Sequence, residues 1–253
     1  MNNTPFLTIL TASYNNQETI SKTLESISVQ TYQNFEHIII DNRSNDRTIE
    51  IIEKYKNKYQ LKFISESDKG IADALNKGLK FSVGKYVLVI HADDYLMHPN
   101  TLSEIIPILI SETNDIISFP VKIKLDKCDY KLKNNRPFYK IIFRSIIPHQ
   151  GAFIHRRLHE KIGEYDRNFK IAIDYDFFYR SYKNKASFLF QNYPISIMEH
   201  GGLGSHPKYR LKRLLENFKV QMKNETNYFI HLLQLLYLMF FSTIYYFKKS
   251  KIK

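Results

Sequence analysis

The chain has 253 residues and a net charge of +12, because 37 lysines and arginines outnumber 25 aspartates and glutamates. This length suits one large α/β domain, or a domain with an appendage, and is enough to bury a sizeable core. The single cysteine, Cys128, excludes a disulfide framework and a cysteine-rich zinc site.

The first 114 residues alternate short apolar runs with stretches of helical periodicity. The runs that we predict to be strands cover residues 7–12, 35–40, 61–65 and 86–90. The predicted helices cover residues 18–29, a stretch around Ile49 and Ile52, residues 70–81, and a stretch that begins at Asn100 or Thr101. This order predicts an α/β fold with a Rossmann-like, mostly parallel sheet.

Right-handed crossovers bring the carboxyl ends of these strands to one edge of the sheet. The residues at those ends are Tyr14, Asp41, Asp68, Asp93 and Asp94. Ligands of α/β sheets bind at this edge, and two adjacent carboxylates make a hard-oxygen site for Mg²⁺ or Mn²⁺ that also holds phosphate. Alternatively, the Asp93–Asp94 pair caps the next helix, because acidic residues favour helix starts.

The pattern changes after residue 115. The further apolar stretches cover residues 116–125, 152–154 and 187–197, of which the first and last are predicted strands and the last is interrupted by Pro194. Residues 138–147 mix apolar and basic side chains and have no clear assignment. Asp174 is well placed as the N-cap of a helix.

The C-terminal segment is basic and apolar. Residues 208–223 predict an amphipathic helix, whose apolar stripe would be Leu211, Leu214, Leu215, Phe218 and Met222. Residues 228–247 are almost wholly apolar, apart from a narrow polar line that includes His231 and Gln234. As a helix they would just cross a hydrocarbon core of about 30 Å. Basic flanks on both sides oppose a single span and favour a helix in the membrane surface. The alternatives are that this helix spans the membrane, or that it packs on the domain or in a homo-oligomer.

Several stretches together resemble the family 2 glycosyltransferases, which have the nucleotide-diphospho-sugar transferase (GT-A) fold. They are LTILTASYNN, HIIIDNRSNDRTIEII, SDKGIADALNKGLKFSVGKYVLVIHADD, HQGAFIHRRLHEKIGEYD, IDYDFFYR and GGLGS. The third stretch is especially similar to members that build capsule, O-antigen or colanic-acid-type polysaccharides. The resemblance covers residues 5–205. It implies a nucleotide-sugar-binding half over residues 1–114 and an acceptor-binding half over 115–206, followed by C-terminal helices over 207–253.

The resemblance also implies roles for individual residues. Asp174 matches the general base, and Asp93 and Asp94 match the metal and ribose motif. Asp41 would accept a hydrogen bond from the uracil N–H. The other residues expected on the nucleotide-sugar side are Ala12, Tyr14, Asp68, Asp73 and Asn76, although an ordinary capped helix with a buried asparagine accounts equally well for the last three.

Three further positions are expected around the site. His149 and Gln150 would line the acceptor side, where a structural histidine is the alternative for His149. His200 lies near a turn that closes over the diphosphate in some relatives and is a candidate metal ligand. His91 stands where the family often has another acid, and we do not expect it to bind metal.

We therefore predict an inverting glycosyltransferase that uses Mn²⁺ or Mg²⁺ and a UDP-sugar. Its acceptor would be a saccharide or polyprenyl-linked sugar, and the enzyme would lie on the inner face of the cell membrane. The first residues have no pattern of a secretory signal, which fits that location. A non-catalytic binding or scaffold protein of the same fold is the main alternative, because His91 replaces an acid. A nucleotidyltransferase and a nucleic-acid-binding protein rank below it, since no glycine-rich phosphate loop is present and much of the basic charge lies beside the apolar tail.

Overall fold

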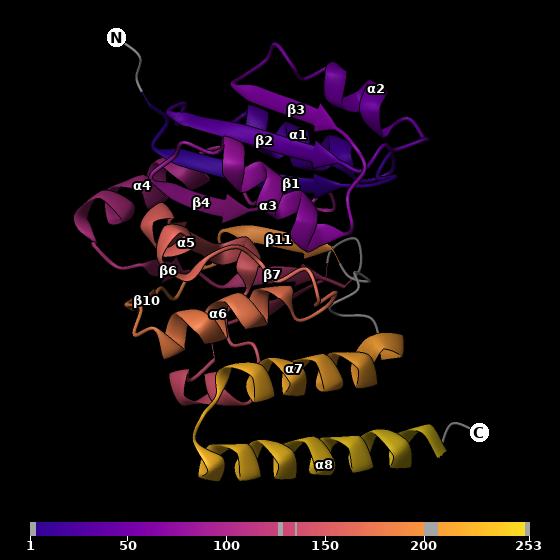
Figure 1. The fold of residues 1–253 in the computed structure, drawn as a ribbon. Coiled ribbons are helices and arrows are strands. Elements are labelled where there is room, and N and C mark those ends of the chain that lie inside the picture. Colours follow the sequence, from indigo (N-terminus) through magenta and orange to yellow (C-terminus); the bar gives the residue numbers. More distant parts are fainter. Residues whose placement is uncertain (1–3, 126–128, 135, 200–206, 251–253) are drawn as a thin grey trace.

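A seven-stranded sheet runs through the centre of the computed structural model, which describes residues 4–125, 129–134, 136–199 and 207–250 (Figure 1). The strand order is β10-β6-β9-β4-β1-β2-β3. Its parallel core consists of β1 (Leu7–Ser13), β2 (Phe35–Asp41), β3 (Leu61–Ser65) and β4 (Tyr86–Val89). Because β1, β2 and β4 are buried, apolar residues predominate in them, although Glu36 and His37 of β2 are buried polar exceptions. The four strands predicted from these runs are confirmed.

Helices cover both faces of this sheet. Leu10 packs with α3 and α6 on one face, whereas its neighbour Ile9 packs with α1 and α4 on the other, because successive strand side chains point to opposite faces. The expected fold class is therefore confirmed. The helices of the domain are α1 (Ile20–Ser28), α2 (Thr48–Glu53), α3 (Ile71–Phe81), α4 (Thr101–Ser111), α5 (Arg156–Ile162) and α6 (Ile173–Lys183), with 3-10 turns η1 (Phe138–Ile142), η2 (His149–Gly151) and η3 (Pro207–Tyr209).

Two predicted strands are each divided between two sheets. The run over residues 116–125 breaks at Pro120, and the run over 187–197 breaks at Pro194, because proline lacks the N–H that a ladder needs. The first half of each run joins the large sheet and the second half joins a small four-stranded sheet, β5-β11-β7-β8. The strands concerned are β5 (Asp94–Leu96), β6 (Ile116–Ser118), β7 (Val121–Lys124), β8 (Tyr130–Lys133), β9 (Ala152–His155), β10 (Phe188–Phe190) and β11 (Ser196–Glu199).

The C-terminal helices α7 (Arg210–Asn224) and α8 (Tyr228–Ser250) form a hairpin at one end of the molecule, with α7 between α6 and α8 (Figure 1). The helix predicted over residues 208–223 is confirmed, but its predicted apolar stripe is not the buried face. Glu216, Val220 and Gln221 are buried, whereas Leu215 and Met222 are about half exposed. Polar contacts with α6 and its flanking loops, rather than apolar packing alone, decide which face α7 turns inward.

Glu216 fixes the segment that leads into α6. Its Oε2 accepts hydrogen bonds from the backbone N–H groups of residues 170, 171 and 172, at 3.1, 2.7 and 3.0 Å. A carboxylate next to a helix N-terminus is also favoured by the helix dipole. The C-terminal hairpin thereby holds the start of α6 in place.

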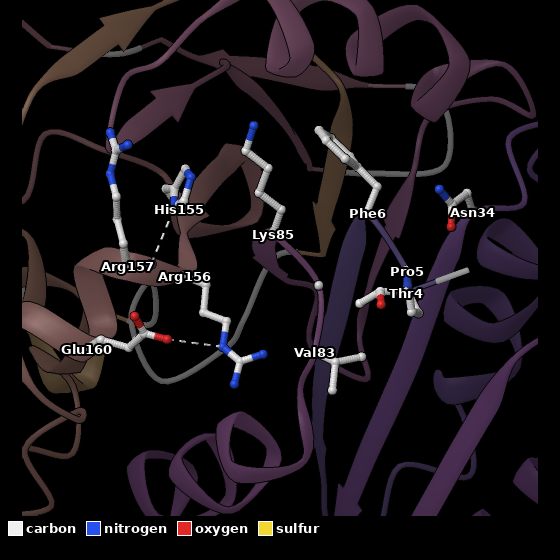
Figure 2. Close-up of a pocket in the computed structure, with 11 residues that line it drawn as sticks. Thr4, Pro5, Phe6, Asn34, Val83, Lys85, His155, Arg156, Arg157 and Glu160 are labelled. Carbon is white, nitrogen blue, oxygen red and sulfur yellow. Dashed lines mark hydrogen bonds and ion pairs between the residues drawn. The ribbon is translucent and has the colours of Figure 1, made fainter. Parts of the chain in front are cut away.

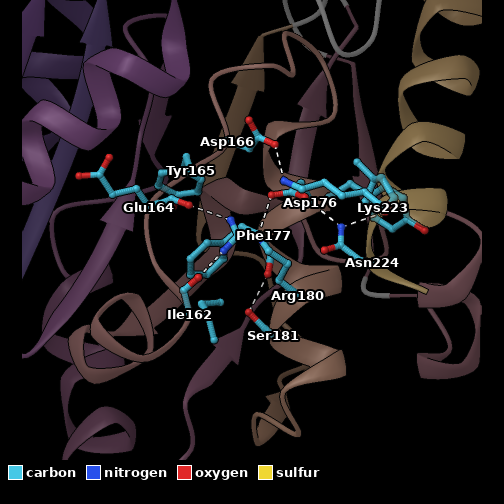
Figure 3. A network of polar contacts seen from close by, with 12 residues as sticks. Ile162, Glu164, Tyr165, Asp166, Asp176, Phe177, Arg180, Ser181, Lys223 and Asn224 are labelled. Carbon is cyan, nitrogen blue, oxygen red and sulfur yellow. Dashed lines mark hydrogen bonds and ion pairs between the residues drawn. The ribbon is translucent and has the colours of Figure 1, made fainter. Parts of the chain in front are cut away.

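A buried ion pair strengthens the same interface (Figure 3). Asp176 is fully buried and pairs with Arg180 at 2.8 Å, and Asn224 of α7 donates to the other Asp176 oxygen at 3.1 Å. Arg180 also donates to the carbonyl oxygens of Ile162 and Glu164. Because both charges are compensated by hydrogen bonds, the loop after α5, α6 and α7 form one unit.

Helix α8 turns its polar line toward the domain. Gln234 is fully buried and donates to the Ile142 carbonyl oxygen at 2.9 Å and to the Tyr179 hydroxyl at 3.1 Å. The opposite side presents Phe229, Leu236 and Phe240, which are 67%, 53% and 62% exposed. Within the described part of the chain, no helix is both long and apolar enough to cross a membrane.

Candidate active site

Three segments that are distant in sequence meet beside the carboxyl end of β4. Asp93 and Asp94 follow β4, His149 and Gln150 belong to η2, and Asp174 lies at the start of α6. Gln150 Nε2 donates to Asp94 Oδ2 at 2.9 Å. His149 Nδ1 lies 3.9 Å from Asp174 Oδ2. Consecutive residues of η2 therefore connect the predicted metal motif to the predicted base.

The position of η2 depends on the glycine at its end. A Cβ atom on Gly151 would lie 2.2 Å from the carbonyl oxygen of Phe119, which is far too close for any side chain. The close approach of these two backbones brings Gln150 within reach of Asp94. A glycine is therefore required here by the packing of η2 on the loop after β6.

Asp94 is a buried carboxylate with one unsatisfied oxygen. The residue is 2% exposed, and its Oδ1 has no hydrogen-bond partner in the described part of the chain, nor has Gln150 Oε1. Burial and then the charge of Asp93 raise the pKa of Asp94 well above its ordinary value. Burial also raises the pKa of the half-buried Asp93. Gln150, Lys133 and the Glu199 backbone favour the charged form of Asp94 but do not outweigh burial, and a cation at this point would add to their effect.

The donor atoms fit a divalent ion such as Mg²⁺ or Mn²⁺. The carboxylates of Asp93 and Asp94 and the free amide oxygen of Gln150 are hard oxygen ligands. Among the residues that the structure describes, no group of three or more His, Cys, Asp or Glu side chains could hold a metal ion. An ion here would therefore need phosphate oxygens of a substrate as further ligands, as Mg²⁺ commonly does. The other candidate ligand, His200, lies outside the described residues.

His91 contributes no charge to the site. Burial is the main influence on this imidazole and lowers its pKa to about 3, so it is neutral at physiological pH. Its ring meets the ring of His149 edge-on, with the ring centres 4.8 Å apart. We infer that His91 supports the position of His149, and the expectation that it binds no metal stays a prediction.

Asp174 does not cap α6, contrary to expectation. The helix begins at Ile173 with Ala172 at the N-cap position, and Glu216 binds the backbone N–H groups of the three residues that precede the helix. Asp174 Oδ1 accepts from the Tyr175 N–H at 2.8 Å, and Oδ2 accepts from Ser145 Oγ at 3.4 Å. The Asp174 side chain is therefore free to face the site, where it is partly exposed.

The carboxyl group of Asp174 is ionised at neutral pH. Burial raises its pKa, but His149, Lys133 and the Tyr175 N–H together outweigh burial and leave the pKa below its ordinary value. An ionised carboxylate, partly open to solvent and 3.9 Å from an imidazole, can accept a proton from a bound hydroxyl group.

The residues expected to hold the nucleotide base lie at the ends of β1 and β2. Tyr14 follows β1 and is 56% exposed, and Ala12 is half-buried within β1. Asp41 is fully buried, and its carboxylate accepts from the Ser44 N–H at 2.8 Å and from the hydroxyl groups of Ser44 and Ser65. Asp41 can accept from a uracil N–H only if the loop around Ser44 moves, so this role stays a prediction.

The residues predicted around α3 have structural partners. Asn76 is fully buried and exchanges two hydrogen bonds with the backbone of Tyr165, so its predicted contact with a nucleotide sugar is wrong. Asp73 accepts from the Lys69 N–H and pairs with Arg167 at 2.8 Å. An ordinary capped helix with a buried asparagine, the alternative interpretation, accounts for both. Asp68 accepts from the N–H of Gly70 at 2.7 Å and is half-buried.

Gln150 requires a correction as well. It was expected on the acceptor side, but it is 2% exposed and its amide orients Asp94. Ser145 and Lys133 were not identified from the sequence. Ser145 contacts Asp174. Burial is the main influence on the half-buried Lys133 and lowers its pKa, while the nearby charges of Asp174 and Asp94 act in the opposite direction. Both belong to basic or unassigned stretches of the sequence, where no motif marks them.

A separate cavity of about 370 Å³ lies away from these residues (Figure 2). Its lining includes Phe6 and Lys85, which precede β1 and β4, and Arg156 at the start of α5. It therefore opens at the amino ends of the strands, the opposite edge from Asp93 and Asp94. No part of the candidate site borders it.

The comparison with protein families decides the classification. A model described as glycosyl transferase family 2 matches residues 8–183, well over half of the chain. The chain belongs to glycosyl transferase family 2. The resemblance noted in the sequence is thereby confirmed, and so is its GT-A fold.

Two curated relatives and one solved structure illustrate the relationship. This family 2 glycosyltransferase is 27% identical over 217 residues to a PGL/p-HBAD biosynthesis glycosyltransferase of Mycobacterium tuberculosis, covering 83% of this chain and 84% of that protein. Over 89 residues it is 40% identical to the UDP-Glc:alpha-D-GlcNAc-diphosphoundecaprenol beta-1,3-glucosyltransferase WfaP of Escherichia coli, covering 35% and 36% of the two chains. The mannosyltransferase PcManGT of Pyrobaculum calidifontis, solved with GDP-Man and Mn²⁺, has the same fold at a TM-score of 0.70 and 20% identity, covering 92% and 70%.

The buried charge of Asp94 leads to a prediction about stability. Asp94→Asn removes that charge, and the new amide can donate to the free Gln150 Oε1. In EDTA at neutral pH we expect the variant to melt higher than the wild type, by about 2–4 °C for each kcal/mol gained. Because the pKa of Asp94 is raised in the folded state, the folded protein loses stability as pH rises through that pKa, so the gain should vanish near pH 4.

Differential scanning fluorimetry with EDTA, or with Mn²⁺ and UDP, measures both effects. The ligands should raise the melting temperature of the wild type but not of Asp94→Asn. Asp166→Asn is the matched control, because Lys223 lies 2.6 Å from Asp166 and, despite burial, the pKa of Asp166 is lowered. That variant should lose stability at neutral pH. A metal-free Asp94→Asn protein that melts below the wild type would contradict the assignment.

Proposed function

We propose that this protein is an inverting glycosyltransferase that moves a sugar from a UDP-sugar to a hydroxyl group of a lipid-linked or saccharide acceptor in cell-surface polysaccharide synthesis. The observation that carries the proposal is the short connection, through Gln150 and His149, between a buried carboxylate with a free oxygen and an ionised carboxylate that can act as a base. The name of WfaP, which acts with UDP-Glc on a diphosphoundecaprenol-linked sugar, supports a UDP-sugar donor and a polyprenyl-linked acceptor.

In this reaction the acceptor oxygen attacks the anomeric carbon as the bond to the diphosphate breaks. Asp174 accepts the acceptor proton, while Ser145 and the Tyr175 N–H hold its carboxylate in orientation. A Mn²⁺ or Mg²⁺ ion on Asp93 and Asp94 would supply Lewis-acid stabilisation of the departing diphosphate. Because the acceptor and the leaving group occupy opposite sides of that carbon, a single displacement inverts its configuration.

The remaining roles belong to the same proposal. Residues 1–114 form the nucleotide-sugar half, with Ala12, Tyr14 and Asp41 near the base, and residues 115–206 form the acceptor half. The non-catalytic alternative is favoured by one observation, the neutral His91 in place of an acid. Nucleotide-sugar-dependent transfer by the purified protein would exclude that alternative.

The role of Asp174 can be tested by substitution. Asp174→Asn should lower the transfer rate by ~10²–10⁴, the usual contribution of a general base. The affinity for the UDP-sugar should change less than about twofold, because Asp174 contacts the acceptor side only. Asp115→Asn is the control, since Asp115 pairs with Arg157 far from the site. The role is disproved if Asp174→Asn retains more than half of the wild-type rate.

We also propose that α8 binds the surface of an anionic bilayer. Helix α8 buries the polar residue Gln234 and exposes the apolar residues Phe229, Leu236 and Phe240. A helix that faces water has the opposite arrangement, with polar residues outside and apolar residues inside. The exposed Lys212 and Lys219 lie on the neighbouring helix, and the sequence adds four lysines after residue 247. This charge complements anionic lipid headgroups.

Vesicle sedimentation tests that surface. Wild-type protein should bind phosphatidylglycerol vesicles more tightly than phosphatidylcholine vesicles, and the double variant Leu236→Glu/Phe240→Glu should abolish binding. The control is Ile110→Glu, an equally exposed apolar residue on α4. If the double variant instead dissociates a dimer in light scattering and the wild type ignores vesicles, the exposed face is a contact between two copies of the chain.

A further inference from the structure

The start of α6, where the candidate base lies, is held by a helix outside the part of the chain that matches the family. The family model matches residues 8–183, whereas α7 begins at Arg210. Two polar residues of α7, Glu216 and Gln221, are only 8% and 2% exposed. Because buried polar groups find their partners inside the protein, the hydrogen bonds of these two residues identify the backbone that α7 fixes.

Glu216 binds the backbone just before Asp174. A single carboxylate oxygen, Oε2, accepts the N–H groups of Lys170, Ile171 and Ala172 at 3.1, 2.7 and 3.0 Å. Hydrogen bonds to a charged acceptor are roughly twice as strong as those between neutral groups. Ala172 is also the N-cap residue of α6. Glu216 therefore fixes the point from which the helix begins, two residues before the base.

Gln221 binds the structure on the other side of Asp174. Its Nε2 donates to the Tyr175 hydroxyl at 3.1 Å and to the Phe143 carbonyl oxygen at 2.8 Å. Tyr175 follows Asp174 in the chain and donates its N–H to Oδ1 of that carboxylate. Ser145, two residues after Phe143, donates to Oδ2. Both of these donors to Asp174 thus lie on or next to a residue that α7 binds.

We infer that Glu216 is a positioning residue for Asp174. The inference rests on the proposed function, in which Asp174 accepts the proton of the acceptor hydroxyl group. Because Glu216 is buried, it acts through the backbone and not on a substrate. A base must lie within hydrogen-bond distance of the proton that it accepts, so a shift of about 1 Å at the start of α6 can lower the rate about 10²-fold.

Glu225 offers a matched control, because it binds the other end of the same helix. It is 5% exposed, and its carboxylate accepts from the Tyr179 hydroxyl at 2.8 Å and pairs with Lys183 at 2.7 Å. Both partners lie in the second half of α6. Glu225→Gln should therefore weaken the attachment of the C-terminal hairpin without moving the start of the helix.

A double-mutant cycle between Glu216 and Asp174 tests the inference. The full chain is assayed with Mn²⁺ for UDP release from UDP-glucose, UDP-galactose and UDP-N-acetylglucosamine, and the fastest of these donors is then used throughout. Glu216→Gln keeps the shape of the side chain but loses the charge, so kcat should fall about tenfold while KM for the donor changes less than twofold. In an Asp174→Asn background, where no base is left to position, the same substitution should lower kcat less than twofold.

Two further measurements separate position from stability. Amide hydrogen exchange at residues 170–172 should become faster in Glu216→Gln but not in Glu225→Gln, because only the former loosens these N–H groups. The melting temperature should fall in both variants. In contrast, kcat measured well below that temperature should fall only in Glu216→Gln.

Three outcomes of the cycle would overturn the inference. The first is a Glu216→Gln protein that keeps more than half of the wild-type kcat. The second is a loss of kcat by the same factor with and without Asp174, and the third is an equal loss in Glu225→Gln; either would assign Glu216 to stability alone. Failure of the proposed function is distinguishable, because it would appear in the wild type itself as absent UDP release, and the inference would then fail with it.

Discussion

The buried carboxylate of Asp94 is the constraint on which the account of this protein depends. It lies where the large sheet ends and the small sheet begins, 2% exposed and with one oxygen lacking a partner. Gln150 satisfies the other oxygen, and Gly151 allows the close backbone contact that brings Gln150 there. A charge in this position destabilises the fold unless a cation accompanies it. The fold therefore sacrifices stability at the point where a metal–diphosphate complex would bind.

The C-terminal hairpin connects this site to the outside of the molecule. Glu216 and Gln221 use the polar face of α7 to hold the start of α6 and the segment around Phe143, so both Asp174 and Ser145 depend on α7 for their position. Gln234 then fastens α8 to the same unit. Because these buried contacts are polar, the apolar side chains of α8 are left outside. The geometry of the candidate site and the exposed apolar face thus depend on one set of contacts.

The sequence predicted the parallel strands well, since a run such as residues 86–90 is apolar throughout and follows a turn. It placed Asp93 and Asp94 after a strand and Asp174 at the start of a helix, as the structure shows, while their roles stay predictions that rest on the family resemblance. It failed where the fold depends on pairing between distant segments. The assignment of residues 116–125 to two sheets, the use of Gln150 on Asp94 and the burial of Glu216 all follow from contacts between residues that are far apart in the sequence. No local pattern carries that information.

The most direct test of the account is the binding of Mn²⁺ to the wild-type protein, measured by electron paramagnetic resonance with and without UDP. Because the chain offers two carboxylates and no third acidic, histidine or cysteine ligand within its described part, Mn²⁺ alone should bind weakly. UDP should tighten its binding at least tenfold by adding phosphate oxygens, and Mn²⁺ should tighten the binding of UDP by the same factor. Equal affinity for UDP in Mn²⁺ and in EDTA would contradict the account.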